Sequence, residues 1–137
     1  MDAAETVPDF QTIGYEEFTP NVESLAEVRR FVRRILKEQG LKEESVARCE
    51  LIADELATNA LTYTGSFYSV VVEQSEASVR IGVRDDSRIL PVLRESTVDS
   101  ESGRGLRIVC ETSSHWGAES LGLGKETWAD VSTEPGG

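Results

Sequence analysis

The stretch Ile52-Ala53-Asp54-Glu55-Leu56-Ala57-Thr58-Asn59-Ala60-Leu61 decides how the chain is interpreted, because it sets polar side chains into an otherwise apolar or small sequence. Glu55 and Asn59 are four residues apart. Both therefore project from the same face of a helix that we expect to run from about Glu43 to Tyr63. A buried carboxylate or carboxamide is costly without hydrogen-bond partners, so this pair indicates either a ligand or exposure to water.

A hydrated magnesium ion beside phosphates would satisfy both side chains. Mg²⁺ takes hard oxygen ligands, keeps several waters and usually lies next to substrate phosphates. The Asn59 carbonyl could ligate it directly, while Glu55 could orient or deprotonate a nearby hydroxyl or water. A surface Glu and a capping or turn-facing Asn remain the simpler interpretation of the spacing alone, since this pair four residues apart is common.

Working outward from this helix, hydrophobic periodicity predicts one domain with α/β architecture. The expected elements, in order, are a strand over 10–18, a helix from an Asn21 N-cap to Gly40, the central helix, strands over 67–73 and 78–85, a short helix Leu106–Thr112, and strands over 115–119 and 126–131. We expect a two-layer sandwich whose mixed, mostly antiparallel sheet is covered on one face by about three helices. Residues 1–9 are expected to form a flexible N-terminus, residues 10–131 the domain, and residues 132–137 a disordered tail.

The charge balance excludes several classes of function. The chain has 14 Lys and Arg against 25 Asp and Glu, a net charge of −11. A general nucleic-acid binder needs the opposite excess, and an anionic membrane surface would repel the chain. Neither a membrane-spanning stretch nor a secretory leader pattern is present, so we expect a cytoplasmic protein. Cys49 and Cys110 lie in apolar helical patterns typical of core cysteines.

The first expected helix carries a strip of basic residues with two interpretations. It is either a solvated face, which is the simpler hypothesis, or a docking strip on an otherwise acidic protein. The strip consists of Arg29, Arg30, Arg33, Arg34 and Lys37.

Two further positions could contact a nucleotide. Gly103-Arg104-Gly105 stands where a loop is expected to enter a helix, and glycines there let the backbone approach an anion beside the positive helix N-terminus. A tight entry turn explains these glycines equally well. Asp85 ends a predicted strand, where its carboxylate could accept a hydrogen bond from the exocyclic amine of adenine or simply begin a turn.

The order of these features resembles the nucleotide-binding fold of the GHKL superfamily, and within it the anti-sigma-factor serine kinases. The segment Glu55–Ala60 is similar to the N box of that family. The segments Val83–Ser87, with Pro91, and Gly103–Val109 are similar to its two glycine boxes. The likeness extends from about Phe10 to Val131.

The resemblance implies a role for each matching residue. Asn59 would bind Mg²⁺ through its side-chain oxygen, and Glu55 would be the general base or would position the attacking hydroxyl. Phosphoryl transfer suits such a site because catalysis there is mostly positioning and charge neutralisation. Residues 86–102 would form the ATP lid. The other implied nucleotide contacts are Asp85 with the adenine amino group, the backbone amides of Gly103 and Gly105, Arg104 as a charge partner, Leu106 in the same glycine box, and Thr127 under the adenine.

The first glycine box departs from the family pattern. That pattern is Asp-x-Gly-x-Gly, whereas Asp85-Asp86-Ser87-Arg88-Ile89 contains no glycine, so the backbone is more restricted here. Three functions therefore stay open. The chain is a Mg-ATP-dependent serine/threonine kinase that phosphorylates a small anti-anti-sigma (STAS-type) partner and sequesters a sigma factor, a partner-capture module with weak or no nucleotide binding, or an unrelated α/β domain. The family likeness also implies a homodimer, with no direct nucleic-acid or membrane partner.

Overall fold

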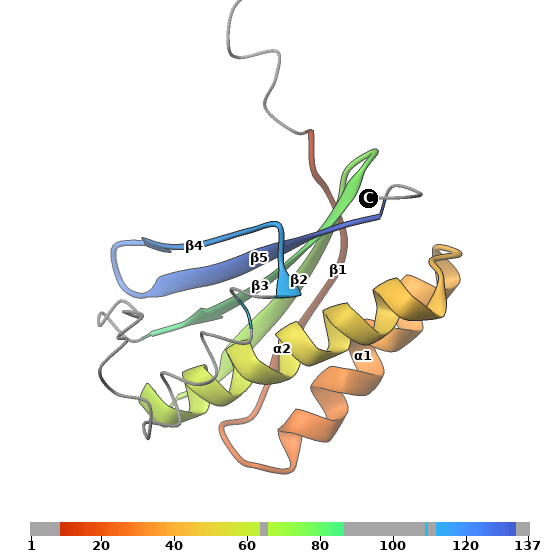
Figure 1. Ribbon diagram of the computed structural model, residues 1–137. Coiled ribbons are helices and arrows are strands. Elements are labelled where there is room, and N and C mark those ends of the chain that lie inside the picture. The colour runs from red at the N-terminus through yellow and green to blue at the C-terminus, as the bar shows by residue number, and fades with distance from the viewer. Residues whose placement is uncertain (1–8, 64–65, 87–108, 110–111, 134–137) are drawn as a thin grey trace, which may run out of the picture.

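The computed structural model describes residues 9–63, 66–86, 109 and 112–133. Its helices and strands, in chain order, are β1 (Gln11–Phe18), α1 (Ser24–Glu38), α2 (Glu43–Tyr63), β2 (Tyr68–Gln74), β3 (Ser78–Asp85), β4 (His115–Ser120) and β5 (Lys125–Ser132). The strands form one sheet in the order β1-β2-β3-β5-β4, and the pairings among these strands are all antiparallel. Both helices cover the same face of the sheet (Figure 1). This arrangement confirms the expected two-layer α/β sandwich.

The ends of the predicted domain are described only in part. Of the third expected helix, Val109 and Thr112 have helical backbone, while the rest of Leu106–Thr112 is mostly outside the described residues. Cys110 and the segments 1–8 and 134–137 also lie outside them. Strand β5 continues to Ser132, which is one residue into the segment expected to be a tail. No helix in the described ranges is long and apolar enough to cross a membrane.

Helix α1 begins at Ser24, later than an Asn21 N-cap predicts. Glu23 occupies the N-cap position and makes no side-chain capping bond. The Asn21 side chain nevertheless accepts a hydrogen bond from the Ser24 backbone N–H at 3.1 Å, so it helps to satisfy a donor in the first turn of the helix. At the other end, Gly40 adopts φ +81° and the Leu41 N–H donates to the Leu36 carbonyl, which ends the helix as predicted.

The hydrophobic core lies between the helices and the inner face of the sheet. Alternate residues of β3 are buried there, and Asp85 at its end continues the alternation. The alternation along β3 therefore places the Asp85 carboxylate on the face of the sheet that the helices cover. Burial raises the pKa of the Cys49 thiol to about 12, consistent with an inert core cysteine. The predicted apolar side of α2 is buried as a set: Val46, Cys49, Ile52, Ala53, Leu56 and Ala60.

Ion pairs between α1 and α2 account for much of the basic strip. Arg29 Nη1 lies 2.6 Å from Asp54 Oδ1, and Arg33 Nη1 lies 2.9 Å from Glu50 Oε1. These side chains still face water, with Arg29 44% and Arg33 37% exposed, so the predicted solvated face is confirmed, and the same arginines also link the two helices. They help to set the orientation of the helix that carries the polar pair. Glu43 is the shared acceptor for Arg33 and Lys37.

The outer face of the sheet, opposite the helices, carries a largely buried carboxylate. The side chain of Glu126 on β5 is 11% exposed, and its Oε2 lies 3.5 Å from Arg84 Nε. The Glu126 carboxylate fits here because Gly82 has no side chain. A Cβ at Gly82 would come within 2.5 Å of the carboxylate oxygen. Burial raises the pKa of Glu126; Arg84 opposes the rise, while Glu73 and Glu119 add to it.

Glu126→Gln is therefore expected to stabilise the protein at pH 7 but not at pH 4. The unfolded carboxyl ionises near pH 4.5, whereas the folded protein holds the proton to higher pH, so ionisation opposes folding as the pH rises through this window. The amide avoids that cost, with a gain below about 1 kcal/mol because the partly exposed Arg84 already offsets part of it. Urea midpoints at both pH values measure it, with exposed Glu76→Gln as the control. A variant less stable than wild type at pH 7 would show that the Arg84 contact outweighs burial.

Candidate functional site

The predicted site residues on α2, β3 and β5 gather at one end of the sheet. The C-terminal end of α2, the end of β3 and the start of β5 lie together there (Figure 1). Across the β3–β5 ladder, Asp85 pairs with Lys125 and Val83 pairs with Thr127. This register places Asp85, Lys125 and Thr127 on the inner face, where all three side chains are buried. Two predicted nucleotide contacts, Asp85 and Thr127, are thus brought together.

Asn59 carries a buried oxygen that needs a ligand. The residue is 7% exposed, and its side-chain Oδ1 has no hydrogen-bond partner in the part of the chain that the structure describes. An unsatisfied buried acceptor costs about 1–3 kcal/mol, so its presence in a packed helix calls for an explanation. Glu55, one turn earlier on α2, is partly exposed. The structure therefore places the two residues of the predicted pair in different environments.

The donor set at Asn59 fits a magnesium ion that arrives with phosphates. An amide oxygen is a hard ligand of the kind Mg²⁺ takes. Among the described residues, no group of three or more His, Cys, Asp or Glu could hold a metal ion. Mg²⁺ bound at Asn59 would therefore take most of its ligands from water and phosphate, which is its ordinary coordination in phosphoryl-transfer sites.

Asp85 is held by a buried lysine that sequence analysis missed as a site residue. Lys125 Nζ donates to both Asp85 carboxylate oxygens at 2.9 Å, and the two side chains are 1% and 3% exposed. Gly124 permits this close approach, because a Cβ there would come within 2.2 Å of the Asp85 carbonyl oxygen. The partners are 40 positions apart. An acid at the end of one strand and a lysine at the start of another indicate an ion pair only when the pairing of the two strands is known.

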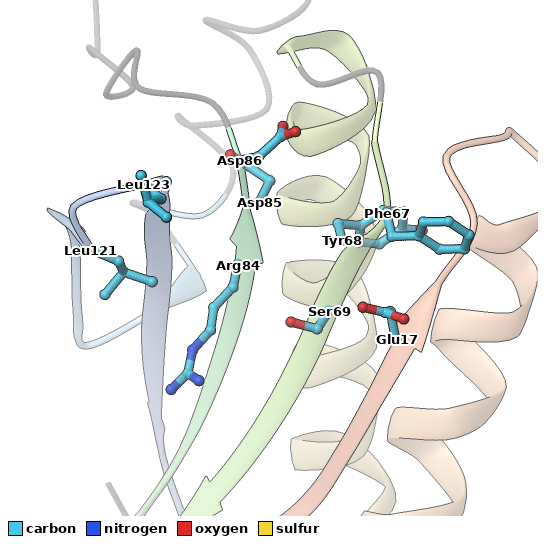
Figure 2. A pocket seen from close by; sticks show the side chains of 10 residues that line it. Glu17, Phe67, Tyr68, Ser69, Arg84, Asp85, Asp86, Leu121 and Leu123 are labelled. Atoms are coloured by element: carbon cyan, nitrogen blue, oxygen red, sulfur yellow. The ribbon is translucent and has the colours of Figure 1, made fainter.

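A hollow of about 300 Å³ opens at the same end of the sheet, and Figure 2 shows its lining. Asp85 and Gly124 contribute to that lining, whereas Lys125 does not. The paired strand residues Glu17, Ser69 and Arg84 also line it, so the hollow opens toward the outer face of the sheet. Three apolar side chains at its margin, Phe67, Leu121 and Leu123, are 53%, 49% and 80% exposed. Apolar surface combined with a few placed polar groups is typical of small-molecule sites.

The remaining predicted contacts cannot be located. Gly103, Arg104, Gly105 and Leu106 lie outside the described residues. Of the segment 86–102 expected to form an ATP lid, only Asp86 is described, and it is exposed at the margin of the hollow.

Comparison with known proteins agrees with this geometry. The family model for the histidine kinase-like ATPase domain matches residues 18–130. The match spans all of α2 and β3 and most of β5, the elements that carry Asn59, Asp85 and Lys125. No curated protein matches the chain. The family supports a GHKL-type fold, ATP binding and a kinase-like regulatory role. The chain belongs to the histidine kinase-like ATPase domain family.

Proposed function

We propose that this chain is a Mg-ATP-dependent serine/threonine protein kinase of the anti-sigma-factor type. The observation that carries the proposal is the buried Oδ1 of Asn59, which lies one helical turn after Glu55 and has no hydrogen-bond partner among the described residues. It supplies a metal ligand at the end of the sheet where Asp85 is buried. An adjacent carboxylate is the group that transfer to a hydroxyl requires.

In this mechanism Asn59 would hold Mg²⁺, which supplies charge neutralisation to the triphosphate. The protein needs that neutralisation, because its own net charge of −11 repels a polyphosphate. The Glu55 carboxylate would orient the partner's Ser or Thr hydroxyl and accept its proton as the oxygen attacks the γ-phosphorus. The bond between that phosphorus and the bridging oxygen breaks, and ADP leaves. Asp85 and Thr127 would contact the base.

The proposal extends to the partners of the chain. The family likeness implies a small STAS-type anti-anti-sigma protein as the phosphorylated substrate and a sigma factor as the captured protein. The same hypothesis includes a homodimer, and a cytoplasmic location where sigma factors act.

The kinase step is tested by incubation with γ-labelled ATP and candidate STAS proteins. Glu55→Gln is expected to bind Mg-ATP within about 3-fold of wild type but to lose at least about 100-fold in phosphate transfer, because a positioned base contributes on that order. Calorimetry checks binding, and a radiolabel or phosphopeptide assay checks transfer. Undiminished transfer by the variant would remove Glu55 from this role.

A second candidate function, partner capture without catalysis, is favoured by the Asp85–Lys125 ion pair. The carboxylate expected to receive the adenine amine already has a charged partner. Titration of the wild-type protein with millimolar Mg-ATP separates the two functions. Saturable heat supports the kinase, and its complete absence leaves the capture module.

A further inference from the structure

We propose that the hollow on the outer face of the sheet docks a segment of a partner protein that presents apolar side chains flanked by lysine or arginine. The strand side chains that line the hollow lie on the face opposite the buried Asp85 and Thr127. The inference rests on the protein-capture part of the proposed function, and its test requires neither ATP nor phosphate transfer.

Exposed apolar side chains gather around this hollow from two separate parts of the chain. Phe67 precedes β2, whereas Leu121 and Leu123 lie in the turn between β4 and β5. Figure 2 shows Phe67 on one side of the hollow and the two leucines on the other. Of the six exposed large apolar side chains in the described residues, these three line a single hollow. Apolar residues clustered in this way mark an interaction site, whereas single exposed ones do not.

The turn between β4 and β5 does not need its leucines in order to close. Tight turns are ordinarily made by Gly, Asn, Asp, Ser and Pro. Here Gly122 supplies the left-handed backbone, with φ +88°, and the Leu121 N–H donates to the Gly124 carbonyl oxygen at 2.8 Å. The Leu123 side chain is 80% exposed. Polar residues would serve this turn equally well, so a contact outside the chain accounts for the leucines better than the fold does.

A row of side chains beside the hollow is acidic. The strand pairing sets these residues side by side on the outer face: Glu17, Ser69, Arg84, Glu126 and Glu119. Three carboxylates and one guanidinium give this acidic row a formal net charge of −2. Arg84 Nε lies 3.5 Å from Glu126 Oε2, so the guanidinium already has a carboxylate beside it. Glu119 is directly opposite Glu126. Like charges in that position are destabilising, so a cation from outside would be favourable here.

These charges decide among the possible occupants of the hollow. A nucleic acid or an anionic membrane would be repelled by the acidic row. A second copy docked through the same patch would bring two identical acidic rows together, and like charges placed opposite each other across an interface cost several kcal/mol. A small molecule would not be enclosed, because the side chain of Leu123 stands out from the surface. A protein segment with apolar side chains and flanking Lys or Arg matches both the apolar margin and the acidic row.

The test titrates the isotope-labelled wild-type chain with three peptides and follows its backbone amide signals by NMR. The probe is acetyl-Lys-Arg-Leu-Phe-Leu-Arg-Lys-amide. In the second peptide Glu replaces every basic residue, and in the third Ala replaces every apolar residue. The probe is expected to bind at least about 10-fold more tightly than either comparison peptide. The signals that shift should centre on Phe67, Leu121 and Leu123.

Two pairs of variants separate the apolar contact from the charge. Leu123→Ala is expected to weaken probe binding about 5- to 10-fold, as truncation of an interface anchor does. Leu51→Ala removes an exposed leucine of α2 that does not line the hollow, and should bind the probe as wild type does. Glu17→Gln should weaken binding and reduce its dependence on salt, whereas Glu76→Gln, in the turn between β2 and β3, should change neither. All four positions are exposed, so the variants are expected to fold.

Each outcome decides the inference. Saturable binding of the probe at the hollow, weakened by Leu123→Ala and not by Leu51→Ala, supports it whether or not the chain binds nucleotide. No binding of the probe, equal binding of the acidic peptide, or shifts confined to another surface overturns it and leaves the kinase proposal intact. Wild-type affinity for the probe in Leu123→Ala also overturns it. Failure of the wild-type chain to bind Mg-ATP removes the kinase and leaves this inference standing.

Discussion

Replacing Asn59 by alanine is expected to weaken Mg-ATP binding, with a rise in Kd of about 10- to 100-fold. The Asn59 side-chain oxygen is the buried acceptor that a metal would satisfy, and loss of an interaction with a charged group alone accounts for about 1.5–3 kcal/mol. Isothermal titration calorimetry with Mg-ATP measures the effect. Thr58→Ala, an exposed position on the same helical turn, is the matched control and should bind as wild type does.

The same position should show a conflict between stability and binding. Asn59→Leu fills a similar volume and removes a buried acceptor that has no partner in the described part of the chain. The free energy of unfolding should therefore rise by about 1–3 kcal/mol while Mg-ATP binding weakens. Urea unfolding without nucleotide measures the rise. Retention of Mg-ATP affinity in Asn59→Ala would contradict the proposed ligand role, whatever happens to stability.

Asp85→Ala is expected to reduce the free energy of unfolding by about 3–5 kcal/mol, because it leaves the ammonium of Lys125 buried without its partner. The double variant Asp85→Ala, Lys125→Met should recover most of that loss, since replacing both members of a buried ion pair by apolar groups is often neutral or stabilising. Urea titrations at pH 7 compare the two.

If the two charges act as one buried pair, the double variant must be more stable than Asp85→Ala alone. If the single and double variants are equally unstable, then the loss comes from the cavity left by Asp85 rather than from an unpaired charge. If the single variant is as stable as wild type, then Lys125 reaches water or another partner once Asp85 is removed.

Local structure was largely predictable from the sequence. The bounds of α2 agree with the expected 43–63, because twenty-one residues of helical periodicity leave little ambiguity. Strand β3 matches 78–85, because Val79, Ile81 and Val83 alternate with non-apolar residues along it. Glu55, Asn59 and Asp85 were identified as candidates because each polar group interrupts or ends an apolar pattern.

Long-range pairing was not predictable, and that is where the site differs from expectation. Nothing local to Lys125 indicates that β5 lies beside β3, so its contact with Asp85 could not be inferred. For the same reason the sheet was expected to be mixed, although the pairings described are antiparallel. The Arg29–Asp54 contact between helices was likewise hidden, because spacing within one helix cannot show which residues of another face it.

The Asp85–Lys125 contact has a topological consequence. Strand β3 ends at Asp85, and β5 begins at Lys125 after the segment that contains β4. The ion pair therefore joins the two ends of a 40-position connection. Closing such a long loop carries an entropic cost that grows slowly with its length, and the Asp85–Lys125 ion pair helps to offset that cost. Any change that separates these two charges would therefore also loosen the junction between the end of β3 and the start of β5.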